Sequence, residues 1–400
     1  MPPSSAPRTG SLTIGGQAFN ITQNGAHNGL RFVPITPCRI ADTRNTDAPS
    51  LATAAERNFT IAGHCGIPAN AEAYSLNLTV VPLGALGFLS VWPAGLSQPS
   101  VSTLNSVDGR IKANAAVVPA GDNGSITLFA SNPTNAIIDV NGYFIPASGN
   151  SDLVFYPLSP CRIVDTRIGA GALAGPALAA ATTRTFPVLS GPCSIPTTAQ
   201  AYALNVTVVP TGTLGFLSAW PAGQGQPGSS TLNAPTGAVT ANATIVPAGT
   251  NGGIAVIATD STHVIIDING YFAPPGSAGG LHFYTATPCR ILDTRVANAY
   301  GAPQLAAAAQ RNFTVAGAVC GIPANAAVFS LNATVVPPAG LGFLTLWGPG
   351  GQPTVSTLNA GDGSIVANAA LVPASATGTV SAFASNLTHL ILDINGYFAQ

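Results

Sequence analysis

Arginine and aspartate are the residues of this chain whose type and spacing are best suited to chemistry. Charged residues make up only 7% of the 400 residues, yet most arginines recur at equivalent positions of a repeated module. The arginine sets are Arg39, Arg44 and Arg57, then Arg162, Arg167 and Arg184, and finally Arg290, Arg295 and Arg311. The aspartates recur with them as Asp42 and Asp139, Asp165 and Asp267, and Asp293 and Asp393. Arginine forks held by carboxylates and carbonyls commonly fix a loop to a sandwich edge.

Two interpretations of this polar set are open. In the first, Asp42, Arg44 and Asp139 form a site for acid–base chemistry or for a calcium ion. Calcium prefers six to eight oxygen ligands, which two carboxylates among arginines do not supply. In the second, paired charges satisfy each other inside the fold. We predict the second arrangement, a structural network beside a disulfide, with no metal and no cofactor.

Catalytic groups do not recur with the repeats. Histidine has no position common to all three copies, although His263 and His389 correspond, and glutamate occurs only at Glu56 and Glu72. The repeated aspartates lie next to arginines, which lower a carboxyl pKa and so oppose a general-acid role. The chain is therefore predicted not to be an enzyme, and a secreted polysaccharide hydrolase is kept as an alternative.

An aromatic strand recurs at residues 87–93, 215–221 and 342–347. A period of two places Phe88, Ser90 and Trp92 on one face and the aliphatic Leu89 and Val91 on the other. The aliphatic face suits a core, and one interpretation therefore leaves the aromatic face exposed to a ligand. Sugar rings stack on such rings and hydrogen-bond to nearby hydroxyls. The alternative is that these large aromatic side chains fill the core.

The strand before each aromatic strand adds polar groups to this predicted sugar platform. Asn77 and Thr79 lie on its polar side, and the turn at residues 82–86 predicts that the two strands pair as a hairpin. The predicted ligand-binding residues are Asn77, Thr79, Phe88, Ser90 and Trp92, Asn205, Thr207, Phe216, Ser218 and Trp220, and Asn332, Thr334, Phe343, Thr345 and Trp347.

The positions of these residues follow from a module written three times. Each copy runs from a Pro-Cys-Arg sequence, the first at residues 37–39, to an Asn-Gly-Tyr-Phe sequence, the first at residues 141–144. The predicted domains are an N-terminal β-hairpin segment at 1–28 and repeats at 29–147, 148–276 and 277–400. Proline- and glycine-rich linkers mark the boundaries between repeats.

Each repeat is predicted to be an all-β domain. Residues 74–81 alternate apolar and small polar side chains, which is typical of a half-buried strand. Further strands are predicted in the first copy at 57–61, 87–92, 102–105, 111–118, 125–130 and 136–144, separated by Pro and Gly turns. Regular short strands of this kind predict three tandem antiparallel β-sandwich, jelly-roll-like domains. We expect three separate domains rather than closure into one body.

The six cysteines indicate the compartment. They occur in pairs at the same points of each copy, namely Cys38 and Cys65, Cys161 and Cys193, and Cys289 and Cys320. We predict one disulfide per repeat and an oxidising, extracellular setting, because no CxxC spacing or shared histidine supports a zinc site. The chain is therefore expected to be secreted or at a cell surface.

Two resemblances extend this interpretation. Residues 11–23, two alternating runs around Gly15 and Gly16, resemble the last hairpin of BACON-type immunoglobulin-like domains, which implies that a preceding domain has been removed. The combination of PCRxxDTR, NxTVV, GFLxxW, STLN and NGYF motifs resembles a repeated module of secreted bacterial multidomain proteins. This second resemblance covers most of the chain and implies an extracellular β-rich module, without implying an activity.

We expect a non-catalytic, multivalent binding or adhesion protein that binds polysaccharide or a cell-surface glycan. The alternative is a structural subunit of an extracellular filament or surface layer, in which the N-terminal hairpin adds strands to a second copy. A net charge of -1 and a single lysine, Lys112, argue against nucleic acid and anionic membranes as partners. No apolar run is long enough for membrane insertion.

Overall fold

A computed structural model of the protein describes residues 8–14, 17–23, 29–147, 152–276, 278–297, 300–317 and 319–400. In these ranges the regular structure consists of β-strands and three single 3-10 turns, at Asp122–Gly124, Val188–Ser190 and Thr250–Gly252. A helix suited to crossing a bilayer is not found within them. The predicted all-β class is confirmed.

Repeat 1 is a sandwich of two four-stranded antiparallel sheets. Its strands are β3 (Leu30–Asp42), β4 (Ala55–Thr60), β5 (Ala73–Pro82), β6 (Leu86–Pro93), β7 (Leu104–Ser106), β8 (Lys112–Pro119), β9 (Ser125–Ala130) and β10 (Thr134–Pro146). The inner sheet has the order β3-β10-β5-β8 and the outer sheet the order β4-β9-β6-β7, and the inner sheet is continuous with that of repeat 3 through the pairing of Leu30 with Phe283. The aliphatic side chains between the two sheets form one core cluster. The predicted antiparallel β-sandwich is confirmed.

Repeats 2 and 3 have the same topology and a core each. The strands of repeat 2 are β11 (Val154–Asp165), β12 (Arg184–Phe186), β13 (Ala201–Pro210), β14 (Leu214–Pro221), β15 (Leu232–Ala234), β16 (Thr240–Pro247), β17 (Ile254–Ala258) and β18 (Thr262–Ala273). Those of repeat 3 are β19 (His282–Asp293), β20 (Ala309–Thr314), β21 (Val328–Val336), β22 (Leu341–Trp347), β23 (Leu358–Ala360), β24 (Val366–Pro373), β25 (Thr379–Ala384) and β26 (His389–Ala399). The predicted domain boundaries fall between β10 and β11 and between β18 and β19.

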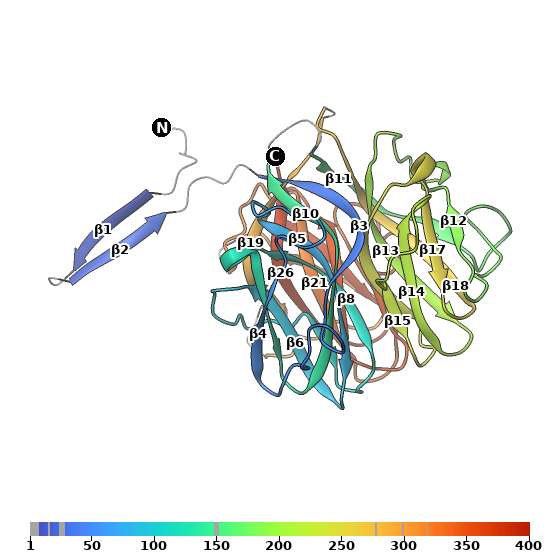
Figure 1. The fold of residues 1–400 in the computed structure, drawn as a ribbon, viewed down its shortest axis with the longest axis horizontal. Coiled ribbons are helices and arrows are strands. Elements are labelled where there is room, and N and C mark those ends of the chain that lie inside the picture. Colours follow the sequence, from blue (N-terminus) through green and yellow to red (C-terminus); the bar gives the residue numbers. More distant parts are fainter. Residues whose placement is uncertain are drawn as a thin grey trace.

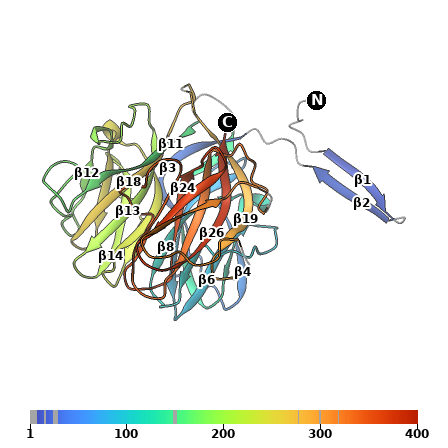
Figure 2. The same ribbon diagram turned by 180° about the vertical axis from the view of Figure 1, so that it is seen from behind.

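The three sandwiches close into one body, so the expectation of three separate domains was wrong (Figures 1 and 2). Each repeat contributes two phenylalanines to a shared buried cluster, at the start of its first strand and in its Asn-Gly-Tyr-Phe sequence. The rings are Phe32, Phe144, Phe155, Phe272, Phe283 and Phe398. A side chain on Gly142 would overlap the ring of Phe32, which explains the glycine before each Tyr-Phe pair. Closure buries apolar surface that a separate repeat would expose.

The edges of the inner sheets also meet across the repeats. The strands β8, β16 and β24 contact one another along a central axis. Their outward backbone N–H groups would be unpaired there, at a cost comparable to a lost hydrogen bond. Instead, the Ala115 N–H donates to Asn242 Oδ1 of repeat 2 at 3.0 Å. The Ala243 N–H likewise donates to Asn368, and the Ala369 N–H to Asn114. Asparagine thus caps each sheet edge from the next repeat.

One disulfide closes each repeat, as predicted. The bonds join Cys38 to Cys65, Cys161 to Cys193 and Cys289 to Cys320. Each links the first strand of its repeat to the loop that follows β4, β12 or β20. The disulfide therefore fixes the long first strand, which carries the Pro-Cys-Arg sequence, against the side of its own sandwich.

The N-terminal hairpin forms a separate two-stranded sheet. Strand β1 (Arg8–Ile14) pairs antiparallel with β2 (Gln17–Gln23), so the predicted pairing is found. The turn predicted at Gly15 and Gly16 lies outside the described residues. Neither strand pairs with a third among the described residues, and the hairpin stands apart from the three-repeat body (Figure 1).

Candidate functional site

The tryptophans of the predicted sugar platform are buried, as in the alternative in which they fill the core, so their assignment to a ligand site was wrong. Trp92 has no exposed surface, and Ser90 likewise has none. The loop that follows β6 folds back over this face. Its carbonyl groups satisfy both side chains, because Trp92 Nε1 donates to Leu96 O at 2.9 Å and Ser90 Oγ donates to Val101 O at 2.5 Å. The equivalent residues are buried in the same way, namely Trp220, Ser218, Trp347 and Thr345.

The phenylalanine of this strand remains partly exposed. Phe88 is half-buried and packs beside Phe129 with ring centroids 5.6 Å apart. Phe216 and Phe343 are also half-buried, and Phe343 packs beside Phe383 at 5.7 Å. Of the predicted aromatic platform, only the phenylalanines are therefore available to a ligand.

The predicted asparagine and threonine groups lie at the junctions between repeats rather than beside the aromatic strand of their own repeat. Strand β5 pairs with β8 and β10, and β6 pairs with β7 and β9 in the other sheet, so the expected hairpin was wrong. The chain crosses between sheets at residues 82–86. Asn77 instead donates to Ser230 O of repeat 2 at 2.7 Å. Asn205 bonds to Ser356 O in the same way, and Asn332 to Ser102 O.

A threonine at each junction has an unsatisfied hydroxyl. Thr79 and Thr207 are 2% exposed and Thr334 is 1% exposed, and the Oγ1 atom of each has no hydrogen-bond partner. A buried hydroxyl without a partner costs free energy. Three such atoms lie at equivalent positions, one in each repeat.

The predicted arginine–aspartate network is present in every repeat. In repeat 2, Arg162 binds Asp267 through two parallel hydrogen bonds of 2.9 and 3.2 Å. Arg167 binds Asp165 at 2.9 and 2.7 Å. Asp267 and Asp165 are buried, whereas 42% of the Arg167 side chain is exposed. The same contacts recur as Arg39–Asp139 and Arg44–Asp42, and as Arg290–Asp393 and Arg295–Asp293.

The third repeated arginine fixes a loop, as proposed from its spacing. Arg57 lies over the ring of Phe59 at 4.8 Å, and its guanidinium donates to the carbonyl oxygens of Asp47 and Pro49. Arg184 and Arg311 do the same over Phe186 and Phe313. These residues shape the loop after the Asp-Thr-Arg sequence and do not line the junctions.

The arginine–aspartate network of one repeat lies beside the half-buried phenylalanine of the next repeat, at the junction between the two repeats. Between repeats 2 and 3, a groove of about 650 Å³ is lined by Arg162, Arg167 and Thr207 from one repeat and by Phe343 and Gln352 from the next. Between repeats 3 and 1, a groove of about 470 Å³ has the same composition, with Arg290, Arg295, Thr334, Phe88 and Gln98. Both volumes are in the range of ligand pockets.

The residues of the remaining junction repeat this pattern. The contact between Asn77 and Ser230 shows that repeats 1 and 2 meet in the same way. The residues at the equivalent positions are Arg39, Arg44 and Thr79 with Phe216 and Gln226. A Gln-Pro pair recurs before the Ser-Thr-Leu-Asn sequence of each repeat. This pair is the sequence signal for the grooves, and the predicted set of ligand-binding residues did not include it.

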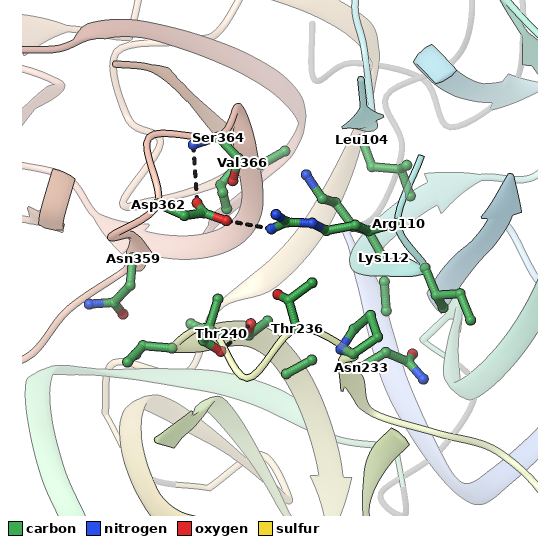
Figure 3. A pocket seen from close by; sticks show the side chains of 18 of the residues that line it. Leu104, Arg110, Lys112, Asn233, Thr236, Thr240, Asn359, Asp362, Ser364 and Val366 are labelled. Carbon is green, nitrogen blue, oxygen red and sulfur yellow. Dashed lines mark hydrogen bonds and ion pairs between the residues drawn. The ribbon is translucent and has the colours of Figure 1, made fainter. Parts of the chain in front are cut away.

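A smaller cavity lies on the central axis, at the opposite end of β8 from the phenylalanine cluster (Figure 3). Its volume of about 60 Å³ is well below that of a typical ligand pocket. Arg110 of repeat 1 forms an ion pair there with Asp362 of repeat 3, and Lys112 donates to Ile365 O. These contacts join the first repeat to the last, so that each of the three repeats contacts the other two.

The two aspartates of each network have opposite pKa shifts. The hydrogen bond from Arg44 lowers the pKa of Asp42 below its usual value of 3.8, and Arg167 does the same to Asp165. Burial raises the pKa of Asp139, although Arg39 and the backbone of Ser230 act against it. Among the described residues, no group of three histidine, cysteine or acidic side chains is arranged to hold a metal ion.

These shifts predict how stability depends on pH. Aspartates with a lowered folded pKa contribute stability above about pH 3.8 that is lost as the pH falls further, because the unfolded chain then binds more protons. The buried aspartates with a raised pKa have the opposite sign, and they favour folding as the pH falls toward 3.8. We expect the free energy of unfolding to increase slightly from neutral pH to about pH 4 and to decrease below it.

Urea unfolding measured from pH 7 to pH 2 checks this profile. Replacing Asp42 with asparagine removes one of the lowered pKa values, and so the loss of stability below pH 4 should become shallower. A decrease in stability that begins between pH 7 and pH 5 would contradict the assignment.

Comparisons with known proteins place the chain in no established group. No family model matches it, and no curated protein does. Solved structures that align with it include a chain of Sulfolobus turreted icosahedral virus, with 10% identity over 98% of this chain and 90% of that one. Another comes from work on the triple jelly roll fold and turret assembly in an archaeal virus, with 11% identity over 99% and 90%. Both have TM-scores of 0.18, which support no inference about this chain.

Proposed function

We propose that the protein is an extracellular, non-catalytic, multivalent binding module that binds carbohydrate in the grooves between its repeats. The observation that carries the proposal is the composition of these grooves, in which a threonine whose buried hydroxyl has no partner lies beside an aromatic ring and an arginine pair. The three disulfides are compatible with an extracellular protein. The proposed site therefore lies at the junction of two repeats and not on the face of one strand, where the sequence pattern had predicted it.

The groove chemistry suits a sugar. A half-buried ring such as Phe343 supplies an apolar surface on which the C–H face of a pyranose packs. Thr207 supplies a hydroxyl that both donates and accepts. Arg167 has one amino group, Nη1, that donates to no acceptor in the described part of the chain. Sugar hydroxyls can satisfy both polar groups. Because no aspartate or glutamate is among the residues that line the two grooves, we propose binding without hydrolysis.

Three equivalent sites on one rigid body favour a repeating ligand. A polysaccharide that occupies one groove raises the effective concentration of its own neighbouring segments at the next groove. Weak individual sites can then give a high combined affinity. This arrangement supports adhesion to a polymer or a glycan-coated surface.

Replacing Thr79, Thr207 and Thr334 together with valine tests the proposal. Valine has the same shape as threonine, and the lost hydroxyls have no partner in the described structure. The triple variant should therefore be at least as stable as the unmodified protein. Its binding per site on a glycan array should fall by about 5- to 100-fold, the effect of losing a hydrogen bond to a buried polar group.

A matched control is Thr127→Val. Thr127 is also buried, but its hydroxyl donates to Asn58 on the outer sheet at 2.8 Å. This variant should lose stability and keep glycan binding, which is the reverse of the triple variant. Unchanged glycan retention by the triple variant would rule out the grooves as the sugar sites.

A second candidate function is supported by the N-terminal hairpin. Its two strands pair only with each other among the described residues, and the edges of such a hairpin can take up a strand from another chain. We propose assembly into a filament or surface layer as this alternative. Removing residues 1–28 should abolish assembly, seen by negative-stain microscopy, and leave glycan binding intact.

A further inference from the structure

We infer that the grooves select an uncharged, polyhydroxylated polymer and exclude acidic polysaccharides. This inference rests on the proposed carbohydrate-binding function and specifies its ligand class. It comes from the way in which the arginines of each groove are paired with aspartates.

Each arginine at the groove between repeats 2 and 3 forms an ion pair with an aspartate. Arg162 and Arg167 face Asp267 and Asp165 through bidentate contacts of 2.7 to 3.2 Å. Two positive and two negative charges within hydrogen-bonding distance give this network a net charge of zero. The bond from Arg167 lowers the pKa of Asp165, which keeps that carboxylate ionised at neutral pH.

The rest of the lining carries no charge. The remaining groove residues between repeats 2 and 3 are aromatic, aliphatic or uncharged polar side chains, including Phe343, Gln352 and Ser356. The groove between repeats 3 and 1 has an equally uncharged lining, which includes Phe88, Gln98 and Ser102. Its two arginines are paired with Asp293 and Asp393. An incoming carboxylate or sulfate would meet arginines that already hold carboxylates.

The physical consequence is a lack of net attraction for an anion. A ligand carboxylate near Arg167 is attracted by the guanidinium and repelled by Asp165 behind it. To form its own bidentate pair it would have to displace Asp165 and leave that buried carboxylate with only the 3.5 Å contact to Arg162 and the Arg167 backbone N–H, which is unfavourable. A sugar hydroxyl needs only the free Nη1 and the threonine Oγ1. Affinity for a neutral ligand also depends little on ionic strength, since no net charge is screened.

The test is affinity electrophoresis of the complete protein against dextran, a mixed-linkage β-glucan, alginate and hyaluronan, at about 20 mM and about 500 mM NaCl. We expect retention by at least one of the neutral glycans, with a dissociation constant that changes less than about twofold between the two salt concentrations. The same retention should be lost in the triple threonine-to-valine variant. Alginate and hyaluronan should not retard the protein.

The failures of the two proposals are distinguishable. Retention by an acidic glycan that weakens steeply with salt and disappears in the triple valine variant would overturn the neutral-ligand inference and leave the grooves as sugar sites. Retention by none of these glycans, nor by any on the glycan array, would overturn the proposed function and the inference together.

A variant that changes the charge of the groove provides a second test, in which a gain of binding is expected. Asp165→Asn removes the carboxylate that neutralises Arg167 and leaves the arginine free to pair with a ligand. The folded variant should gain salt-sensitive retention by alginate. A folded variant without that gain would contradict the role given to the aspartate, and if the variant does not fold, the salt dependence of the unmodified protein decides the question.

Discussion

Replacing Asn242 with leucine is expected to destabilise the whole three-repeat body by about 3 to 5 kcal/mol, because it leaves several buried polar groups unpaired. Asn242 is 1% exposed. Its amide donates to Asn77 Oδ1 at 2.8 Å and to Thr231 O at 2.7 Å, and its carbonyl accepts from the Ala115 N–H. Leucine has a similar size but can make none of these bonds. The loss is measured as the free energy of unfolding in urea.

The matched control is Asn233→Leu. Asn233 is half-buried in the same repeat, and its amide donates to Gly215 O at 2.9 Å through a bond that is exposed to solvent. This change should cost about 1 kcal/mol or less, since water can replace the lost bond. Equal losses in the two variants would show that the asparagines between repeats do not hold the body together.

Replacing Phe144 with alanine is expected to cost about 3 to 5 kcal/mol, the usual range for removing a buried aromatic ring. Phe144 has no exposed surface. Its ring packs 4.5 Å from Phe283 of repeat 3 and 5.0 Å from Phe32 of its own repeat, measured between centroids. The ring therefore contributes to the contact between repeats as well as to its own sandwich. Limited proteolysis should show faster cleavage between β10 and β11, alongside the lower stability in urea.

Phe129→Ala is the control for this prediction. Phe129 is half-buried on the outer sheet, where it touches Phe88, and it contributes nothing to the central cluster. Its loss should cost less and leave cleavage between the repeats unchanged. Faster cleavage in both variants would mean that the junction does not depend on the central phenylalanines.

Much of each repeat could be predicted from the sequence. The alternation at residues 74–81 lies within strand β5, and the strand predicted at 125–130 matches β9. The cysteine pairs and the arginine–aspartate network were predicted because covalent and charge pairing leaves a spacing that repeats with the module. The long first strand β3 was missed, because its Pro and Cys residues obscure the alternation.

The closure of the repeats could not be predicted from alternation alone. Residues 73–80 of β5 are all buried, although Ser75, Asn77 and Thr79 had been interpreted as a solvent-facing side. A period of two separates the two faces of a strand but does not show what covers them. Here one face meets the outer sheet and the other meets the neighbouring repeats, where asparagine side chains satisfy the polar groups. The sequence signal for this closure was the scarcity of charged residues, which make up only 7% of the chain.

The candidate site was predicted in part for the same reason. The phenylalanines, threonines and arginines that line the grooves all had been singled out, but they were assigned to separate surfaces of one repeat. Trp92 was misplaced because alternation within a strand cannot reveal a loop that folds over it and accepts its hydrogen bond. The grooves depend on contacts between residues far apart in the sequence, such as Thr207 and Phe343.

The central claim is that each junction between repeats is a separate ligand site. Isothermal titration calorimetry with a neutral oligosaccharide selected on the array tests it most directly, by comparing the unmodified protein with the single variant Thr207→Val. We predict that one site per chain weakens by about 5- to 100-fold while the remaining sites keep their affinity. A titration identical to that of the unmodified protein, or the loss of all binding in the folded variant, would contradict the claim.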